Sequence, residues 1–144
     1  MTVKFKKLVP TAIIPSYQTK RSAGLDLCTI EKFTILANGG TYTVNTGLSV
    51  EMPDVYEMQI RPRSGLAAKN QITVLNTPGT IDSDYRGEIK ILLKNFGPYT
   101  VTFNAGDRIA QGVIARVEKP IILEVEDLSE TERGEGGFGS TGIK

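Results

Sequence analysis

Branched and aromatic residues recur along this chain in short runs, which clusters of turn-forming residues separate. The runs that favour β-strand lie at residues 33–36, 41–52, 56–60, 72–75, 88–96, 99–103, 109–117 and 121–125. Clusters of Asn, Gly, Pro and Asp fall between several of them, at residues 38–40, 52–54, 97–98 and 104–107. Short strands with turns at this spacing predict an all-β sandwich or barrel.

One stretch of the chain favours a helix instead. Residues 66–69 are good helix formers, and Ser64 before them is a candidate N-cap. We therefore expect a single short helix, over residues 64–70, in an otherwise all-β fold.

The composition of the chain changes at Ser129. From there on glycine is frequent and Phe138 is the single aromatic residue, so this stretch cannot build a hydrophobic core. We therefore expect a β domain over residues 1–128 and a mobile, glycine-rich carboxy-terminal arm over residues 129–144.

The arm has two interpretations. A chain end of this composition is usually a frayed terminus without function. Here, however, Arg133 can fork onto a phosphate and Phe138 can stack on a base. The amide of Gly139 and the hydroxyls of Ser140 and Thr141 can surround anionic oxygens. The arm is therefore either frayed or a clamp for an anionic ligand with a flat ring.

Composition narrows the functions that are open to this chain of 144 residues, a length typical of one domain. Seventeen basic and sixteen acidic residues leave a charge of +1, which provides no long-range field for nucleic acid or an anionic membrane.

The absence of histidine excludes histidine triads and histidine-bound metals. A single cysteine, Cys28, suits a reducing compartment and excludes an intramolecular disulfide. No apolar run approaches the roughly 18 residues of a membrane span. We expect a cytoplasmic protein that contacts neither nucleic acid nor membrane directly.

Several residues suit a local phosphate site. Arg63, Ser64 and Gly65 place a guanidinium, a hydroxyl and a backbone amide at the amino end of the expected helix. Gln111 is a neutral donor in an otherwise apolar strand. The alternatives are that Arg63 forms only a surface ion pair and that Gln111 is merely exposed. Asp26, between apolar neighbours, is either a turn cap or an acid near a metal, and the pattern does not decide between these. A metal in this chain would be a hard, oxygen-bound cation such as Mg²⁺.

An acid-rich segment at residues 79–87 lies between two of the expected strands. It contains Asp82, Asp84 and Tyr85, so the two strands and their polar tip could form a ligand-binding hairpin. The alternative is a solvated hairpin whose acids only keep a sheet edge soluble.

Together, five segments resemble the five motifs of the trimeric dUTP pyrophosphatases, the dUTPases. They are AGLDL at 23–27, RPRSGLA at 61–67, Asn76 with GTIDSDYRG at 79–87, GDRIAQ at 106–111 and RGEGGFGSTG at 133–142. One motif would be weak evidence, whereas five in the family's order over nearly the whole chain are highly specific.

Two positions depart from the common pattern of the family. Leu25 stands where the family often has Tyr, and Gly112 stands where a larger apolar residue is common.

The resemblance implies a jelly-roll-like β-barrel that assembles as a homotrimer with shared active sites. It implies Mg²⁺-dependent hydrolysis of dUTP to dUMP and pyrophosphate, which limits uracil incorporation into DNA and supplies dUMP. Asp82 would orient and deprotonate the water that attacks the α-phosphorus. Asp26 would hydrogen-bond waters of the Mg²⁺. The phosphates would be held by Arg63, Ser64, Gly65 and Gln111.

The resemblance also assigns residues to the nucleoside. Tyr85 would lie against the deoxyribose and leave no space for a 2′-hydroxyl. Lys90, on the same hairpin as Asp82, would also line the site. Uracil would be bound by the hairpin backbone at Asn76, Gly79, Thr80 and Ile81. When the arm closes, Arg133 would bind the γ-phosphate and Phe138 would stack over uracil, with Gly139, Ser140 and Thr141 beside them.

Two other functions stay open. A deoxycytidine triphosphate deaminase shares the barrel and the substrate type, but the segment at residues 79–87 is like that of a dUTPase. A non-catalytic, nucleotide-binding regulatory protein could keep the pocket and act through partners. Ammonia release would identify the first, and dUTP binding without turnover would identify the second.

Overall fold

The computed structural model describes residues 1–140 of the chain, and these residues form strands and one short helix. The strands in the first half are β1 (Lys4–Lys7), β2 (Leu25–Cys28), β3 (Phe33–Ile35), β4 (Thr41–Asn45), β5 (Leu48–Glu51) and β6 (Tyr56–Arg61). Helix α1 (Ser64–Asn70) follows, and then β7 (Ile72–Val74), β8 (Gly79–Ile81), β9 (Lys90–Asn95), β10 (Val101–Phe103) and β11 (Arg108–Arg116). The prediction of an all-β fold with one short helix is confirmed.

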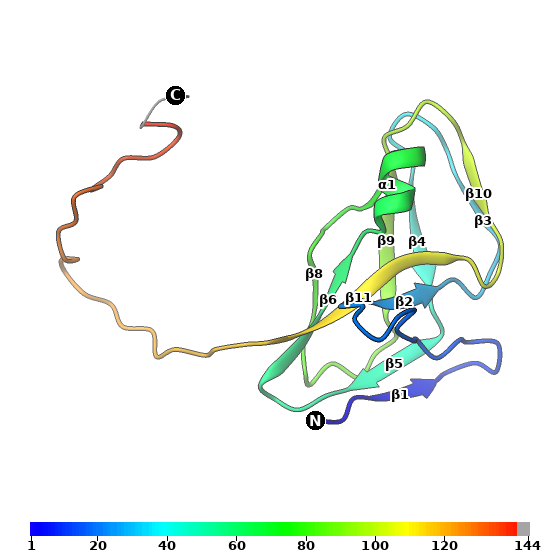
Figure 1. Ribbon diagram of the computed structural model, residues 1–144, viewed down its shortest axis with the longest axis horizontal. Helices are drawn as coiled ribbons and strands as arrows, with labels where there is room; N and C mark the ends of the chain where they lie inside the picture. The colour runs from blue at the N-terminus through cyan, green and yellow to red at the C-terminus, as the bar shows by residue number, and fades with distance from the viewer. Residues whose placement is uncertain (141–144) are drawn as a thin grey trace.

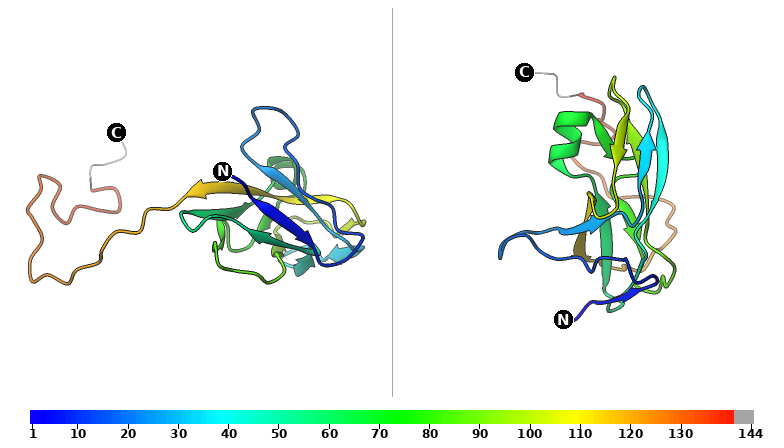
Figure 2. Two further views of the ribbon diagram at one scale, coloured as in Figure 1. Left: turned by 90° about the horizontal axis from the view of Figure 1, so that it is seen from below. Right: turned by 90° about the vertical axis from the view of Figure 1, so that its right-hand side faces the viewer.

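All strand pairs are antiparallel, and strands distant in the sequence lie side by side. The largest sheet has the order β2-β11-β6-β8, and a second sheet has the order β4-β9-β7. Two further pairs, β1-β5 and β10-β3, complete the barrel. Figure 1 shows the strands wrapped around one interior with α1 at one end, and Figure 2 shows the loop before β2 projecting from the barrel. This arrangement is that of a jelly-roll-like barrel.

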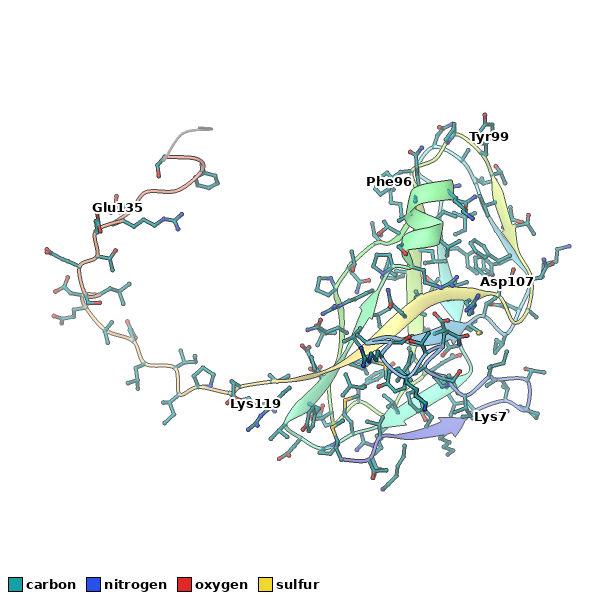
Figure 3. All side chains as sticks on the ribbon, in the orientation of Figure 1. Lys7, Phe96, Tyr99, Asp107, Lys119 and Glu135 are labelled. Carbon is teal, nitrogen blue, oxygen red and sulfur yellow. The ribbon has the colours of Figure 1, made fainter. Side chains whose placement is uncertain are left out.

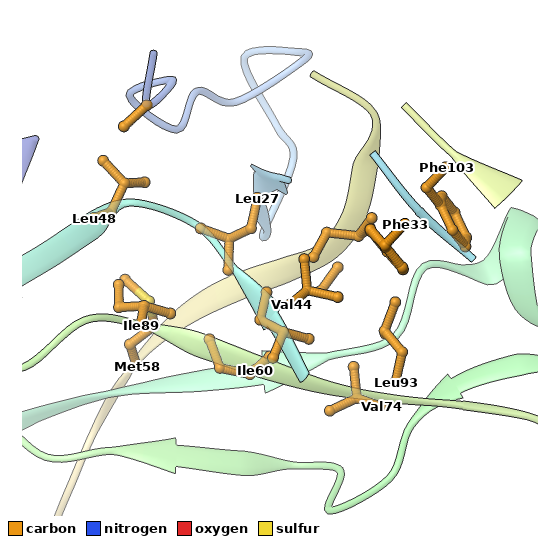
Figure 4. Close-up of a cluster of buried hydrophobic side chains, with 14 of the residues drawn as sticks. Leu27, Phe33, Val44, Leu48, Met58, Ile60, Val74, Ile89, Leu93 and Phe103 are labelled. Carbon is orange, nitrogen blue, oxygen red and sulfur yellow. The ribbon is translucent and has the colours of Figure 1, made fainter. Parts of the chain in front are cut away.

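The strands enclose one apolar core because their side chains alternate between interior and solvent. In β9, Ile91 and Leu93 are buried whereas Lys90 and Leu92 are exposed. Figure 4 shows Leu93 meeting side chains of other strands, such as Val74, in this core. Burying each such side chain contributes about 1.5–3 kcal/mol, so the core is the main source of stability.

Asn95 is a polar residue with no solvent exposure at the end of β9. Its side-chain amide donates hydrogen bonds to the carbonyl oxygens of Ile35 and Tyr99, at 3.4 and 2.8 Å, and its side-chain oxygen accepts one from Gly97 N at 2.9 Å. A buried amide is tolerated because these partners satisfy it, and it ties β3 to the loop before β10.

The hairpin predicted around the acid-rich segment is present. β7 pairs with β9, with Val74 opposite Leu93, and the acid-rich segment lies in the connection between them. Part of that connection was predicted only as a polar tip, but residues 79–81 form β8 on the edge of the largest sheet. Two further strands, β1 and β2, were also missed, because each has only four residues.

Other local predictions need correction. The strand predicted at residues 41–52 is two strands, separated where Gly47 adopts a φ of +65°. Ser64 is not an N-cap: Arg63 takes that position, in extended conformation and without a side-chain cap bond. The strand predicted at residues 121–125 is absent, and Ile121 and Ile122 are 88% and 86% exposed. The residues of that segment favour a β-strand, but no strand of the described chain lies beside it to form a pair.

The two positions that depart from the family pattern both lie against the core. Leu25 is buried, so it contributes apolar packing in place of an aromatic ring. A Cβ atom added at Gly112 would lie 2.9 Å from the sulfur of Met58, which is itself fully buried. The long side chain of Met58 therefore fills the space that a larger residue at 112 would occupy.

The chain leaves the barrel after β11, as the labels of Lys119 and Glu135 in Figure 3 show. Among the described residues, the last hydrogen bond from this segment to the barrel is donated by Val117 N to Val55 O at 2.9 Å. Hydrogen bonds farther along join arm residues to one another. The mobility of the arm stays a prediction.

Within residues 1–140, the structure contains no helix with the length and apolar character needed to cross a membrane.

The thiol of Cys28 provides a test of the packing around β2. Burial chiefly, and the nearby Asp26 carboxylate, raise the pKa of this thiol, although Arg108 and Arg63 oppose the shift. We expect the native protein at pH 7.5 to react with a disulfide reagent at least about 10²-fold more slowly than the protein in guanidinium, because both access and thiolate fraction are reduced. Absorbance of the released thiol measures both rates. Equal rates would show that β2 is not packed as described.

Candidate active site

A concavity of about 410 Å³ opens where β2, β11 and the start of α1 meet. β2 supplies Asp26 and β11 supplies Gln111, and these two residues are directly opposite in the strand register. Because opposite residues in an antiparallel pair point to the same face, both side chains reach the concavity. Its lining consists of Gln18, Ser22, Ala23, Gly24, Asp26, Arg63, Ser64, Gly65, Arg108 and Gln111.

Two guanidinium groups flank one carboxylate in this concavity. Arg63 Nε lies 3.3 Å from Asp26 Oδ1, and Arg108 Nη1 lies 3.0 Å from Asp26 Oδ2. Arg63 also donates a hydrogen bond from Nη1 to the main-chain oxygen of Arg108, at 3.1 Å. The three side chains together carry a charge of +1, which suits an anionic ligand.

The amino end of α1 adds donors to the same concavity. Ser64 and Gly65 are exposed, and no acidic residue lies in the first turn of the helix. The first amides of a helix have no partner within the helix, so they are free to bind an anion. The four residues predicted to hold phosphates, Arg63, Ser64, Gly65 and Gln111, are therefore brought together with Asp26, and we call this hollow the phosphate concavity.

The position of the Gln111 side chain depends on Gly24, to which the sequence analysis gave no separate role. Gln111 Nε2 donates a hydrogen bond to the main-chain oxygen of Pro62, at 3.0 Å. In this position its side chain lies across Gly24, and a Cβ atom added there would lie 3.0 Å from Gln111 Cδ and overlap Oε1. A side chain at residue 24 would therefore displace the end of the Gln111 side chain. The only signal for Gly24 in the sequence was its place within the first motif.

The predicted hairpin residues do not line this concavity. Thr80 and Asp82 line a second concavity, of about 530 Å³, with Asp54, Glu57 and Lys119 among its other residues. The Asp82 side chain is exposed, so solvent can reach its carboxylate.

The rest of the predicted uracil hairpin surrounds β8. Asn76 packs against buried Gly79, with its Nδ2 atom 3.1 Å from the position of an added Cβ. Ile81 is half-buried and packs on the core. Lys90, which opens β9, lies with Nζ 4.0 Å from Glu88 Oε2.

Tyr85 folds back over its own loop. Its hydroxyl donates a hydrogen bond to Glu88 O at 3.0 Å, and a Cβ atom at Gly87 would overlap the ring. The absence of a side chain at Gly87 therefore lets the Tyr85 ring lie flat. Tyr85 is 43% exposed, so a ligand can reach it.

The phosphate concavity and Asp82 lie at opposite ends of β6. Ile81 pairs with Met58, so Asp82 follows beside Glu57, whereas Arg63 comes six residues after Glu57 along an extended chain. At about 3.3 Å per residue, roughly 20 Å separates the two. One chain therefore does not bring Asp82 and its own Arg63 to a single α-phosphate.

The arm extends away from the barrel (Figure 1), and none of residues 129–140 lines either concavity. Arg133 Nε donates a hydrogen bond to Gly136 O at 2.8 Å, and the Phe138 ring is fully exposed. Gly139 and Ser140 lie with Arg133 around a shallow hollow within the arm itself. Thr141 lies outside the described residues.

No group of three or more Cys, Asp or Glu side chains in residues 1–140 is placed to hold a metal ion. Asp26 is the one carboxylate among the residues that line the phosphate concavity. A cation bound there would thus take most of its ligands from phosphates and water, which is the usual arrangement for Mg²⁺.

Comparison with known proteins gives consistent results over the whole chain. A family model described as dUTPase matches residues 11–142. A deoxyuridine 5′-triphosphate nucleotidohydrolase of Wolinella succinogenes is 56% identical over 142 residues, which cover 99% of this chain and 95% of that protein. Its counterpart in Nautilia profundicola is 58% identical over 142 residues, which cover 99% of each.

Solved structures share the fold. The dUTPase of Staphylococcus bacteriophage 80alpha with dUPNHPP matches with a TM-score of 0.91 and 28% identity over 99% of both chains. A dUTPase from phage phi11 of S. aureus, described with a structural Mg(II) ion, matches with a TM-score of 0.82 and 24% identity over 90% of this chain and 100% of that one. The second likeness supports the fold alone.

The packing of Gln111 on Gly24 leads to a prediction. Gly24→Ala should displace the Gln111 side chain and weaken binding of the dUTP analogue dUPNHPP by roughly fivefold, the equivalent of about one hydrogen bond. Stability should change by less than about 1 kcal/mol. Calorimetric titration and thermal melting measure the two quantities. In a Gln111→Ala background the same change should have no further effect on affinity, and a full additional loss there would separate Gly24 from Gln111.

Proposed function

This chain belongs to the dUTPase family, whose reaction is the hydrolysis of dUTP to dUMP and pyrophosphate, and we propose how its residues divide that reaction. The phosphate concavity carries the proposal, because it joins Arg63, Gln111 and the amino end of α1 around a net positive charge. The reaction limits incorporation of uracil into DNA and supplies dUMP.

Asp82 acts as the general base. A water molecule held by its carboxylate gives up a proton to it as the water oxygen attacks the α-phosphorus, and the bond from that phosphorus to the bridging oxygen breaks. The departing pyrophosphate takes the negative charge, which is stabilised by Arg63, Gln111 and the amides of Ser64 and Gly65. Support comes from the exposure of Asp82, because the carboxylate is open to both water and substrate.

Mg²⁺ is the proposed cofactor, and Asp26 would hold it through water. Each oxygen of Asp26 accepts one contact from an arginine, and a carboxylate oxygen has a second lone pair for a water ligand. When bound, Mg²⁺ would neutralise charge on the triphosphate oxygens.

The hairpin selects the nucleoside. The backbone around Asn76, Gly79, Thr80 and Ile81 would offer fixed donors and acceptors to uracil, and cytosine would leave them unpaired. The exposed face of Tyr85 would lie against the deoxyribose and exclude a 2′-hydroxyl. Lys90 is the neighbouring cation on β9.

The proposed role of Asp82 as general base can be tested by removing the charge of its carboxylate. Asp82→Asn should keep the fold and the affinity for dUPNHPP but lower kcat for pyrophosphate release from dUTP by roughly 10²-fold or more. Asp84→Asn, in the same exposed loop, is the matched control and should retain most of the activity. Full turnover by the Asp82 variant, with an intact assembly, would exclude Asp82 as the base.

We further propose a homotrimer with shared active sites, located in the cytoplasm. The separation of about 20 Å between Asp82 and Arg63 of one chain supports the shared site, because a second chain can bring the missing half. The segment between β11 and the arm supports assembly, since the exposed side chains of Ile121, Ile122 and Leu128 are typical of a surface that a partner covers. Arg133 and Phe138 would then close the arm over a neighbour's site, with Gly139, Ser140 and Thr141 around the phosphates.

Mixed trimers test the sharing of sites. Chains that lack residues 130–144 should still form folded trimers, because residues 130–140 contribute nothing to the core. They should have little activity, because the proposed clamp is removed. Chains with Asp82→Asn should also be nearly inactive. Co-refolding equal amounts should restore about a quarter of wild-type activity, since one site in four then pairs an intact hairpin with an intact arm.

Native mass spectrometry shows whether the refolded trimers are mixed, and pyrophosphate release measures their activity. Trimers that are mixed by mass but remain as inactive as their parents would show that the arm does not act across subunits.

A further inference from the structure

Arg108 faces the phosphate concavity, although neither the fold nor the reaction as proposed gives it a role. We propose that Arg108 is a positioning residue: it holds Asp26, and through Asp26 it holds the guanidinium of Arg63 in the orientation that binds the triphosphate. This inference rests on the proposed role of Arg63 as a phosphate ligand.

The backbone of β11 is built to aim Arg108 at the site. Arg108 pairs with Cys28 and Ala110 pairs with Leu27, so one extra residue, Ile109, lies between two successive pairs. This irregularity is a β-bulge. It is also visible in the burial pattern, because the consecutive residues Ile109 and Ala110 are both buried.

The bulge changes the face on which Arg108 lies. In a regular strand Arg108 would share a face with Ala110 and Gly112, both of which are buried. With the bulge, Arg108 shares the face of Gln111 and meets Asp26 from the neighbouring strand. Without the bulge, the charged group of Arg108 would point toward the core.

The contacts of Arg63 explain what this arrangement achieves. Its Nε atom is held by Asp26 Oδ1 at 3.3 Å, and its Nη1 atom donates to the main-chain oxygen of Arg108 at 3.1 Å. Two of its edges are thus tied to the barrel, which leaves Nη2 to bind a phosphate. Arg108 contributes both the oxygen that receives Nη1 and the side chain that holds Asp26 Oδ2 at 3.0 Å.

A second cation on Asp26 also keeps Arg63 available. With Arg108 present, the negative charge of Asp26 is divided between two guanidinium groups. Without the Arg108 side chain, Asp26 would be free to rotate and pair with Arg63 alone, in competition with the phosphate. The side chains of Asp26 and Arg63 are only 14% and 28% exposed, so solvent screens this competition only in part.

Binding measurements in EDTA test the inference without metal or turnover. Arg108→Ala should weaken binding of dUPNHPP by about tenfold, a typical coupling for residues in one charged network, and should change binding of dUMP by less than about twofold. Arg108→Lys, which can still reach Asp26 with one charge, should recover most of the loss. Arg116→Ala is the matched control: Arg116 lies at the far end of β11, is paired with Glu118 and should have no effect.

A double-mutant cycle separates positioning from direct contact. In an Asp26→Asn background, Arg108→Ala should cost at least threefold less affinity than it does in the wild type, because Arg108 acts through Asp26. A loss as large as in the wild type would mean that Arg108 touches the phosphates itself and would overturn the inference, as would no loss in the wild type.

Arg63→Ala keeps this outcome distinct from a failure of the proposed function. If Arg63→Ala weakens dUPNHPP binding and Arg108→Ala does not, only the role of Arg108 is wrong. If Arg63→Ala has no effect, the phosphate site itself is misassigned. Thermal melting of each variant excludes unfolding as the cause of a loss.

Discussion

The site depends above all on the pairing of β11 with β2 along one edge and with β6 along the other. These antiparallel ladders place Gln111 opposite Asp26 on one side and opposite Arg61 on the other, and the chain then continues from Arg61 to Arg63. A shift of one residue in either ladder would turn Asp26 or Gln111 toward the core. The backbone hydrogen bonds of one strand therefore fix the relative positions of groups from three segments distant in the sequence.

Charge balance is the second constraint, and it follows from this geometry. One carboxylate between two guanidinium groups keeps the arginines ordered while leaving a net positive charge for a polyphosphate. Donors that are already oriented lose little freedom when an anion binds, which is the general advantage of a preorganised electrostatic site. The same principle explains Gly24, because the ordered position of Gln111 requires the space that a side chain at 24 would fill.

Two features of the described chain support the proposed homotrimer. The barrel encloses one apolar core, but the segment after β11 carries apolar side chains that the barrel does not cover. The proposed base and the proposed phosphate ligands lie at opposite ends of β6. A homotrimer would account for both features, because a neighbouring barrel could cover that segment and complete the site.

Much of the fold could be predicted from the sequence alone. The core strands, such as β9, alternate between buried Ile91 and Leu93 and exposed neighbours, and this local pattern is visible in the letters themselves. The helix was found because residues 66–69 favour it. The edge strand β1 was missed because its lysines show no apolar alternation, and the strand expected at residues 121–125 was wrong because propensity does not supply a pairing edge.

For the site, the sequence determined which chemical groups were available, and its five motifs identified the family and hence the reaction. It could not show that Arg108 and Arg63 share Asp26, that a bulge turns Arg108 to that face, or that Gln111 lies over Gly24. These facts were decided only by the tertiary structure. The physical reason is that composition and periodicity act within a strand, whereas register, bulges and ion pairs join residues that can be more than eighty positions apart in the chain.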